Sequence, residues 1–296
     1  MMCTPKTKSP RDNNFLTFEL YNPNGISKEG VFDTLLSRDV DALLLCETHA
    51  NKYLQKQLEQ RNIETHRMVW GDAVDQKVFT GVAACFAWQS AWSVSRIDFK
   101  DKECAIYEAQ GRLMCIQVFR GDGKRSMIFY LCYGEAGARW ELIKKKRTLK
   151  MLRAIQRHTV LRGDVCAFIC GDMNLELANI SDWYASMCKL GWCDASKWGS
   201  AAEQAKPTCR KGGGSKIDWV LCNRPACNGM ESYEVVRGLK EKDHDIIRIR
   251  CKLPIASQVQ YMPRKAGAGR VTFQRLGKDA EQWSNRSLRA SGVEDL

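Results

Sequence analysis

A carboxylate and an amide follow a short apolar run near the middle of the chain. Residues Cys166–Cys170 have the length and composition of a buried strand, and Gly171, Asp172, Met173 and Asn174 come directly after them. Polar side chains at the tip of a buried strand are held rigidly and face a cleft, where they can activate water or bind a metal ion. Because most Gly-Asp-x-Asn tetrapeptides are simple turns, this chemistry depends on partners elsewhere in the chain.

Other polar side chains also stand at the ends of apolar runs. Each of them alone has a structural explanation, such as a turn, a helix cap or packing. Their shared position favours a common site. They are Asn22 and Asn24 after Phe15–Leu20, Glu47 after Ala42–Cys46, Tyr133 at the end of Met127–Tyr133, Asp218 in Ile217–Cys222, and Asp243 and His244 before Ile246–Cys251.

The elements that position these residues are strands and helices in mixed order. Strands clustered between residues 81 and 133, combined with strands that follow helices, predict an α/β fold in which mixed sheets pack face to face with helices outside. The remaining expected strands are Gly81–Trp88, Trp92–Phe99, Cys104–Ala109 and Leu113–Phe119. The expected helices are Lys28–Leu36, Asn51–Gln60, Arg139–His158 and Ile180–Leu190, with Ser27 and Ser181 as N-caps of the first and the last.

The order of these motifs resembles the endonuclease/exonuclease/phosphatase superfamily. The resemblance spans residues 15–251 and is strongest to the endonuclease domains of non-LTR retrotransposons and their AP-endonuclease relatives. It implies a four-layer α/β sandwich of two mixed β-sheets flanked by helices. The motifs that carry it are Asn22-Pro23-Asn24-Gly25, Glu47-Thr48-His49, Tyr133-Gly134, Gly171-Asp172-Met173-Asn174, Ser215-Lys216-Ile217-Asp218-Trp219 and Lys242-Asp243-His244.

The chemistry that the resemblance implies is metal-assisted hydrolysis of a phosphodiester. Carboxylate and amide oxygens suit Mg²⁺ or Mn²⁺. Glu47 would be the main metal ligand, with Asn24 nearby and Asp243 as a further contributor.

The catalytic roles follow from the same resemblance. Asp172 would orient and deprotonate the attacking water, with help from Asn174. His244 would stabilise the charge on the phosphate, and Asp218 would orient its imidazole. Tyr133 and Asn22 would donate hydrogen bonds to phosphate oxygens.

Two residues depart from the family's pattern. Lys242 stands where serine is common, and Asp245 stands where a small or uncharged residue is usual. An extra acid at Asp245 could compete for the metal or shift His244 towards its charged form.

The charge distribution predicts an acidic polymer such as nucleic acid, or an anionic membrane, as partner. The net charge is +12. The segment from Arg139 to Arg162, an expected amphipathic helix, contains nine Lys or Arg residues and only one Glu. Arg210, Lys211 and Lys216 precede Asp218 and would add substrate-binding cations at the cleft. We therefore expect a DNA endonuclease. The alternatives are a phosphatase or phosphodiesterase acting on inositol phosphates or lipids, and a non-catalytic nucleic-acid-binding relative.

One domain is expected over residues 13–254, between a flexible N-terminus (1–12) and a basic flexible tail or linker (255–296). With no apolar run of bilayer-spanning length and no signal-peptide pattern, we expect an intracellular, nuclear protein with no membrane partner, which could be part of a retroelement polyprotein. The fourteen cysteines are interpreted as reduced small hydrophobes. Without a Cys-x-x-Cys pair, and with four scattered histidines, the sequence predicts no structural zinc site.

Overall fold

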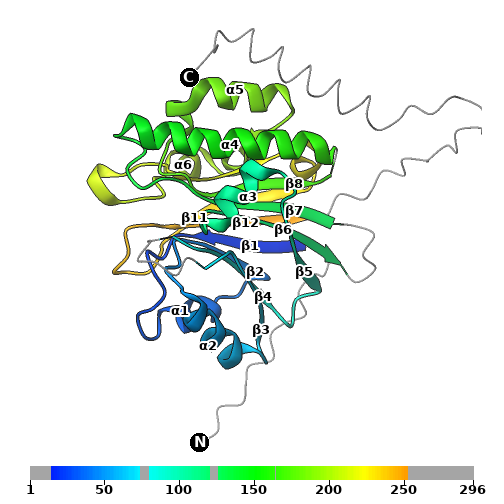
Figure 1. The fold of residues 1–296 in the computed structure, drawn as a ribbon, viewed down its shortest axis with the longest axis vertical. Helices are drawn as coiled ribbons and strands as arrows, with labels where there is room; N and C mark the ends of the chain where they lie inside the picture. Colours follow the sequence, from blue (N-terminus) through cyan, green and yellow to red (C-terminus); the bar gives the residue numbers. More distant parts are fainter. Residues whose placement is uncertain (1–14, 74–79, 121–125, 164, 253–296) are drawn as a thin grey trace, which may run out of the picture.

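Two mixed β-sheets pack face to face between two layers of helices (Figure 1). The computed structural model describes residues 15–73, 80–120, 126–163 and 165–252, so the expected N-terminal segment 1–12 and the tail 255–296 lie outside the described residues. The predicted four-layer α/β sandwich is confirmed. None of the described helices combines the length and apolar character that crossing a bilayer requires.

The first sheet has the strand order β11-β12-β1-β2-β4-β3, and β1 and β2 are its parallel pair. Its strands are β1 (Phe15–Tyr21), β2 (Ala42–Cys46), β3 (His66–Trp70), β4 (Val82–Ala87), β11 (Met230–Val236) and β12 (Ile246–Lys252). The second sheet has the order β5-β6-β7-β8-β10-β9, and β7 and β8 are its parallel pair. Its strands are β5 (Trp92–Ile97), β6 (Leu113–Arg120), β7 (Ser126–Tyr133), β8 (Ala167–Asp172), β9 (Cys193–Asp194) and β10 (Asp218–Cys222).

The helices cover the outer faces of the two sheets (Figure 1). The first sheet carries α1 (Val31–Leu36) and α2 (Lys52–Asn62), and the second carries α3 (Lys102–Ala109), α4 (Leu142–Arg162) and α5 (Ser181–Lys189). The short elements are η1 (Leu177–Ile180), η2 (Ala195–Trp198), α6 (Ala201–Ala205), η3 (Lys211–Gly213) and α7 (Arg224–Cys227).

Aromatic side chains from both sheets fill the space between them. Phe18 of β1 meets the ring of Phe129 edge-on at 5.1 Å, and Phe129 stacks on Phe168 at 4.9 Å. All three rings are essentially buried, and burying one such side chain contributes about 2 kcal/mol. Because this core clamps β1, β7 and β8 together, the residues that follow these strands are held at a defined separation.

The prediction of a strand over Cys104–Ala109 was wrong, because this segment lies in α3. The Asp101 side chain caps the helix by accepting a hydrogen bond from the Cys104 backbone N–H at 2.9 Å. Cys104, Tyr107 and Glu108 are buried at helical spacing. The capping Asp101 was visible in the sequence, but Ile106 and Tyr107 favoured a strand.

Two predicted caps were also wrong, and three strands were missed. The N-cap of α1 is Gly30 in a left-handed conformation (φ 74°), and Ser181 is the first residue of α5 with Ile180 as its N-cap. The missed strands are β3, β9 and β11. β9 has only two residues, and β3 and β11 contain charged and polar residues that blur their alternation. β3 and β11 are the two edge strands of the first sheet and β9 is an edge strand of the second, so each of them pairs with a neighbour on one side only.

Candidate active site

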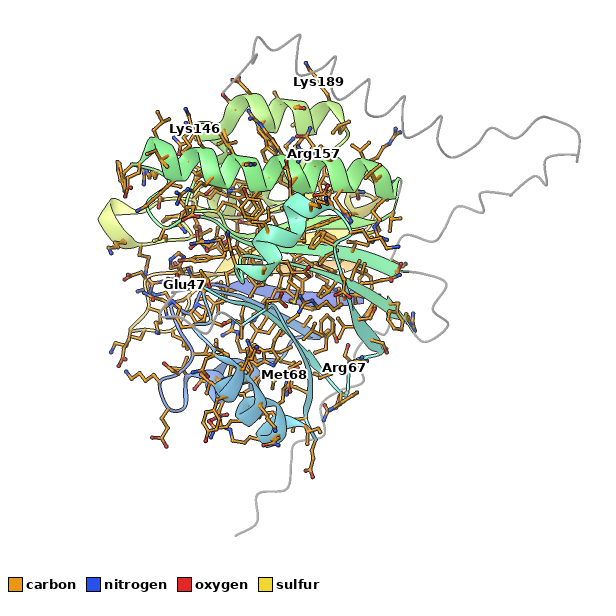
Figure 2. The ribbon with its side chains drawn as sticks, in the orientation of Figure 1. Glu47, Arg67, Met68, Lys146, Arg157 and Lys189 are labelled. Atoms are coloured by element: carbon orange, nitrogen blue, oxygen red, sulfur yellow. The ribbon has the colours of Figure 1, made fainter. Side chains whose placement is uncertain are left out.

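The ends of five strands meet at one edge of the sandwich. Since β1 and β2 are parallel, as are β7 and β8, their last residues lie side by side. β10 runs antiparallel to β8, so its first residue, Asp218, pairs with Asp172, which in turn pairs with Tyr133 of β7. Paired residues project on the same face of a sheet, and in β8 this face carries Phe168 and points towards the first sheet. Figure 2 shows Glu47 at this edge, at the level between the two sheets.

A buried asparagine joins the two sheets across this edge. The Asn22 side-chain amide donates hydrogen bonds to Glu47 Oε2 at 2.7 Å and to Asp172 Oδ2 at 2.8 Å. Its carbonyl oxygen accepts the Asn24 backbone N–H at 2.7 Å. Asn22 therefore sets the separation of two carboxylates from different sheets.

A histidine and two buried aspartates form the second half of the site. His244 Nδ1 lies 2.8 Å from Asp218 Oδ2, and His244 Nε2 lies 4.0 Å from Asp172 Oδ2. Their side-chain ligand atoms lie within 4.8 Å of one another. The His244–Asp172 separation is too long for a hydrogen bond but would accommodate an oxygen atom between the two groups.

The buried charges shift each other's protonation. Burial and the neighbouring charge of Asp218 raise the pKa of Asp172 from 3.8 to about 7. Burial alone would lower the pKa of His244, but the charge and hydrogen bond of Asp218 raise it from 6.5 to about 12. At neutral pH the imidazole is therefore cationic, while the Asp172 carboxyl is poised to exchange a proton.

Glu47 is the carboxylate best prepared to stay ionised. Burial tends to raise its pKa, but hydrogen bonds with His49, Asn22 and Tyr133 outweigh burial and lower it. His49 Nε2 lies 3.3 Å from Glu47 Oε1. Burial and the charge of Glu47 raise the pKa of Tyr133, so its hydroxyl keeps its proton and can donate it in a hydrogen bond.

Backbone strain is concentrated at the same edge. Within the described ranges, the non-glycine residues with positive φ are Asn24 (45°), Glu47 (54°), His49 (53°) and Asn174 (53°). This conformation costs about 1–2 kcal/mol for a residue that carries a Cβ atom. All four residues belong to motifs that the resemblance assigned to the site, and strain of this kind accumulates where chemistry constrains side-chain direction.

A close approach of two backbones holds the Asp172 turn in place. A Cβ atom on Gly134 would lie 2.1 Å from the Met173 carbonyl oxygen, and one on Gly171 would lie 1.9 Å from that of Cys132. The Gly134 N–H donates to the Asp172 carbonyl at 2.8 Å. Glycine is required at both positions because no side chain fits between the ends of β7 and β8.

The donor set suits a hard divalent cation at Glu47. The Glu47 side chain is 16% exposed and therefore open to a ligand, and its carboxylate oxygens are the kind of ligand that such cations prefer. Asn174 Nδ2 is buried and has no hydrogen-bond partner in the protein, which fits a donor awaiting a water or a phosphate oxygen. Asn24 and Asp243, the other predicted ligands, have exposed side chains at the rim.

Comparison of the structure with known structures identifies the fold. The catalytic domain of Xenopus laevis APE2 covers 86% of this chain and 99% of its own, with a TM-score of 0.63 and 17% identity. The 3'-5' exonuclease NExo from Neisseria meningitidis covers 80% of this chain and 100% of its own (TM-score 0.59, 16% identity). The AP endonuclease LMAP from Leishmania major covers 81% and 89% (TM-score 0.63, 10% identity). No protein-family model and no curated protein sequence matches the chain.

The chain has the endonuclease/exonuclease/phosphatase fold. The structure also accounts for its two departures from that family's sequence pattern. Lys242 Nζ donates to the carbonyl oxygens of Asn24 at 2.9 Å and Gly25 at 3.4 Å, so it ties two motif loops together. The Asp245 carboxylate forms an ion pair with Arg210 and accepts a hydrogen bond from the Gly238 N–H at 2.9 Å, so both partners stabilise its negative charge.

The predicted substrate-binding cations have different surroundings. Arg210 binds Asp245 and the carbonyl oxygens of Lys242 and His244. Lys216 Nζ lies 3.2 Å from Asp194 Oδ2. Lys211 is exposed in η3. A substrate role for these three side chains stays a prediction.

Sequence reasoning missed several supporting residues. The Arg112 guanidinium lies 5.4 Å from the centre of the Tyr133 ring and donates to the Gly134 carbonyl at 2.8 Å. The Thr208 hydroxyl accepts the Asp218 backbone N–H at 3.0 Å. His49 had a visible signal, because it belongs to the Glu47-Thr48-His49 motif, but Arg112 and Thr208 are recognisable only through contacts distant in sequence.

Proposed function

We propose that the protein hydrolyses phosphodiester bonds of nucleic acid with the help of a divalent cation. The observation that carries the proposal is the Asn22 amide, which holds Glu47 and Asp172 together at the edge where His244 and Asp218 also lie. This combines an ionised carboxylate for a metal, a carboxyl group near its own pKa at neutral pH, and a fixed cation.

Each of these residues has a proposed step. Asp172, with its pKa near 7, accepts a proton from the attacking water. The unpartnered Asn174 amide helps to orient that water. Protonated His244, held by Asp218, and the Tyr133 hydroxyl stabilise charge on the phosphoryl oxygens.

Glu47 would hold Mg²⁺ or Mn²⁺, with Asn24 and Asp243 as contributors from the rim. Such a cation, when bound, supplies a Lewis acid that polarises the phosphate and stabilises the leaving oxygen. The strained Glu47 backbone and the bonds from Asn22 and His49 fix the direction of the carboxylate. This pre-organisation spares the residue a conformational cost on metal binding.

The surface around the site supports nucleic acid as substrate. Trp140, 80% exposed, lies in the loop that follows Tyr133, and the Arg139 guanidinium lies 4.8 Å from the centre of its ring. Exposed aromatic faces beside cations stack on bases. In Figure 2, Lys146 on α4 lies towards the same side of the view as Glu47, whereas Arg157 lies further along the helix. The basic side chains of α4 would provide further cations for a phosphate backbone.

The finer assignment is an endonuclease that nicks DNA. It rests on the resemblance of the motifs to retrotransposon and AP-endonuclease domains, and it implies a nuclear protein and a larger retroelement polyprotein. The sequence context of the nicks, mapped on a plasmid, tests target-site specificity. Imaging of a tagged protein tests nuclear localisation.

The central test is nicking of supercoiled plasmid DNA in Mg²⁺, alongside abasic duplex, RNA and inositol phosphates. Asp172→Ala and His244→Ala should each reduce nicking by at least about 100-fold. Asp182→Asn, an exposed change in the first turn of α5, is the matched control and should retain full activity. Hydrolysis of inositol phosphates without nicking would favour the phosphatase alternative. DNA binding in chelator without cleavage in Mg²⁺ would favour a non-catalytic relative. Either result would overturn the proposal.

A further inference from the structure

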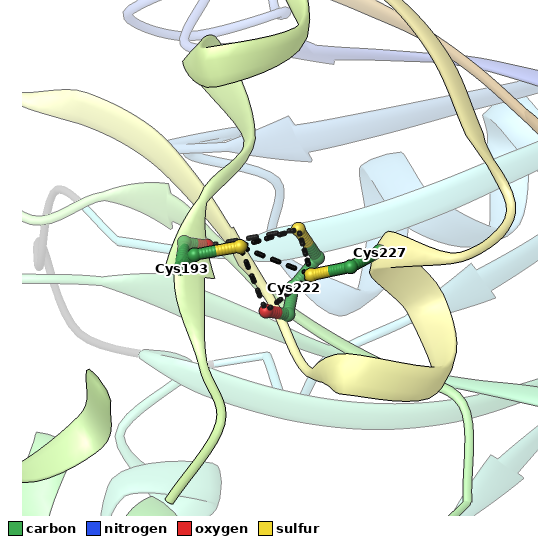
Figure 3. A group of neighbouring side chains, drawn as sticks. All are labelled: Cys193, Cys222 and Cys227. Atoms are coloured by element: carbon green, nitrogen blue, oxygen red, sulfur yellow. Dashed lines mark hydrogen bonds between the residues drawn. The ribbon is translucent and has the colours of Figure 1, made fainter. Parts of the chain in front are cut away.

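Three cysteine thiols from separate elements meet at a second position in the fold (Figure 3). Cys193 lies in the edge strand β9, Cys222 ends β10, and Cys227 ends α7. The Sγ–Sγ distances are 3.0 Å for Cys193–Cys227, 3.5 Å for Cys222–Cys227 and 3.8 Å for Cys193–Cys222. Each thiol therefore touches both of the others.

This cluster is separate from the candidate active site. Asp218 starts β10 and Cys222 ends it, four residues later, which corresponds to about 13 Å along the strand. Cys222 is buried, whereas Cys193 and Cys227 are half-buried, so the group is accessible to small ions from one side.

The separations match those of a thiophilic metal site. Zinc–sulfur bonds are about 2.3 Å long, so two sulfur ligands of a tetrahedral Zn²⁺ lie about 3.8 Å apart. The Cys193–Cys222 distance already has this value, the Cys222–Cys227 distance is slightly shorter, and the Cys193–Cys227 pair would have to open by less than 1 Å. The three sulfur atoms thus outline one face of a tetrahedron, which leaves the fourth position to a ligand other than these thiols.

The backbone that carries the thiols is fixed before any metal binds. Cys193 and Cys222 are direct neighbours in the β9–β10 ladder. The Asn223 side chain caps α7 by accepting the Ala226 N–H at 3.2 Å, accepts the Ala167 N–H at 3.0 Å, and donates to the Val165 carbonyl at 2.7 Å. This anchors α7 to the start of β8 and holds Cys227 against the strand pair. A site organised by such outer contacts loses little entropy when the metal binds.

We propose that Cys193, Cys222 and Cys227 form a zinc site with three thiolate ligands and one exchangeable water. Soft thiolate ligands select Zn²⁺ over the hard Mg²⁺ or Mn²⁺ proposed for Glu47. On binding, each thiol releases its proton to solvent and the sulfur lone pair forms the bond to the metal. The ion would fasten β9, a two-residue edge strand, to β10 and α7.

A disulfide is the main competing fate of these thiols. It could use only two of the three sulfur atoms and would require the 3.0 Å Cys193–Cys227 pair to close to about 2.05 Å. The mutual contact of all three thiols favours a metal, which uses them together.

The test is metal uptake by the full-length reduced protein. Titration with Co²⁺ as a spectroscopic substitute for Zn²⁺ should produce one equivalent of thiolate-to-metal charge-transfer absorption, which added Zn²⁺ abolishes. Cys193→Ser and Cys227→Ser should each lose this absorption. Cys188→Ser, an exposed cysteine on α5, is the matched control and should retain it. Carboxylate-bound Co²⁺ at Glu47 produces no such band, so the two sites are distinguished.

Thermal unfolding provides a second readout. Zn²⁺ at 100 times its Kd should raise the Tm of the wild type by about 5–10 °C more than that of Cys193→Ser or Cys227→Ser. Because these two thiols are half-buried, serine there should leave the fold intact, and circular dichroism checks this. The proposal is overturned by a folded wild type without the charge-transfer band, by a band that persists in both variants, or by mass spectrometry that finds a Cys193–Cys227 disulfide in protein alkylated on isolation.

Discussion

Replacing the proposed base Asp172 with asparagine is expected to stabilise the fold at pH 8 while abolishing activity. The Asp172 side chain is 1% exposed, and burial together with the charge of Asp218 raises its pKa from 3.8 to about 7. Its ionised form is therefore poorly tolerated in the folded state. Asparagine has nearly the same shape and carries no charge at any pH.

The magnitude follows from the two pKa values. A carboxyl group with a higher pKa in the folded state contributes stability that is fully present below 3.8 and is lost as the pH rises through about 7. The difference corresponds to about 4 kcal/mol, of which about 3 kcal/mol is lost between pH 5 and pH 8. The Asp172→Asn side chain would keep only one of the two hydrogen bonds that Asp172 accepts from Asn22 and Asn174, at a pH-independent cost of about 1–3 kcal/mol.

The assay is thermal unfolding of wild type and Asp172→Asn from pH 5 to pH 8 in chelator. The Tm of Asp172→Asn minus the Tm of the wild type should increase by about 6–12 °C between pH 5 and pH 8, because 1 kcal/mol shifts the Tm of a domain this size by about 2–4 °C. Asp182→Asn, an exposed change on α5, is the matched control and should not show this gain. A Tm difference between wild type and Asp172→Asn that does not change with pH would refute the idea that this carboxyl is strained by burial.

Three further substitutions test the site and its supports. Glu47→Gln should keep the hydrogen bond to Asn22 but reduce Mg²⁺-dependent nicking by about 100-fold or more, and recovery of the wild-type rate at high Mg²⁺ would limit its role to affinity. Asp245→Ala should lower the free energy of unfolding, measured in urea, by about 1–3 kcal/mol, because the half-buried Arg210 would lose its ion-pair partner. The Arg210→Ala/Asp245→Ala double variant should lose less stability than the sum of the two single variants. Gly134→Ala should cost about 1–3 kcal/mol and impair nicking, because its Cβ meets the Met173 carbonyl at 2.1 Å; an unchanged Tm would contradict this.

Much of the layered fold could be predicted from local patterns. The fully buried strands β2 and β8 and the alternating strand β12 were recognised, because burial on one or both faces of a strand is reflected in its residue types. The secondary-structure predictions failed where the sequence pattern was weak. Within residues 104–109 only Ile106 and Tyr107 favour a strand, and the segment follows the capping Asp101. The edge strands β3 and β11 alternate poorly, and β9 has only two residues.

In the candidate site, too, some features could be predicted from the sequence and others could not. Asp172, Glu47 and His244 could be proposed from sequence because each follows or precedes a strand in a motif of recognisable order. The assignment of Arg210 to the substrate could not foresee its ion pair with Asp245, which joins a loop to residues 35 positions away. Competition between partners of opposite charge is decided by three-dimensional distance, which linear spacing does not record.

The sequence by itself determined which chemical groups stand at the ends of the strands and that the strands form a layered α/β core, because both follow from local composition and order. Only the tertiary structure decided their partners. The Asn22 amide bridges Glu47 and Asp172, 25 and 150 residues away, because the packing of Phe18 on Phe129 and Phe168 fixes one sheet over the other. The proximity of the Cys193, Cys222 and Cys227 thiols depends likewise on strand register and on the turn into α7, so no spacing motif in the sequence predicts it.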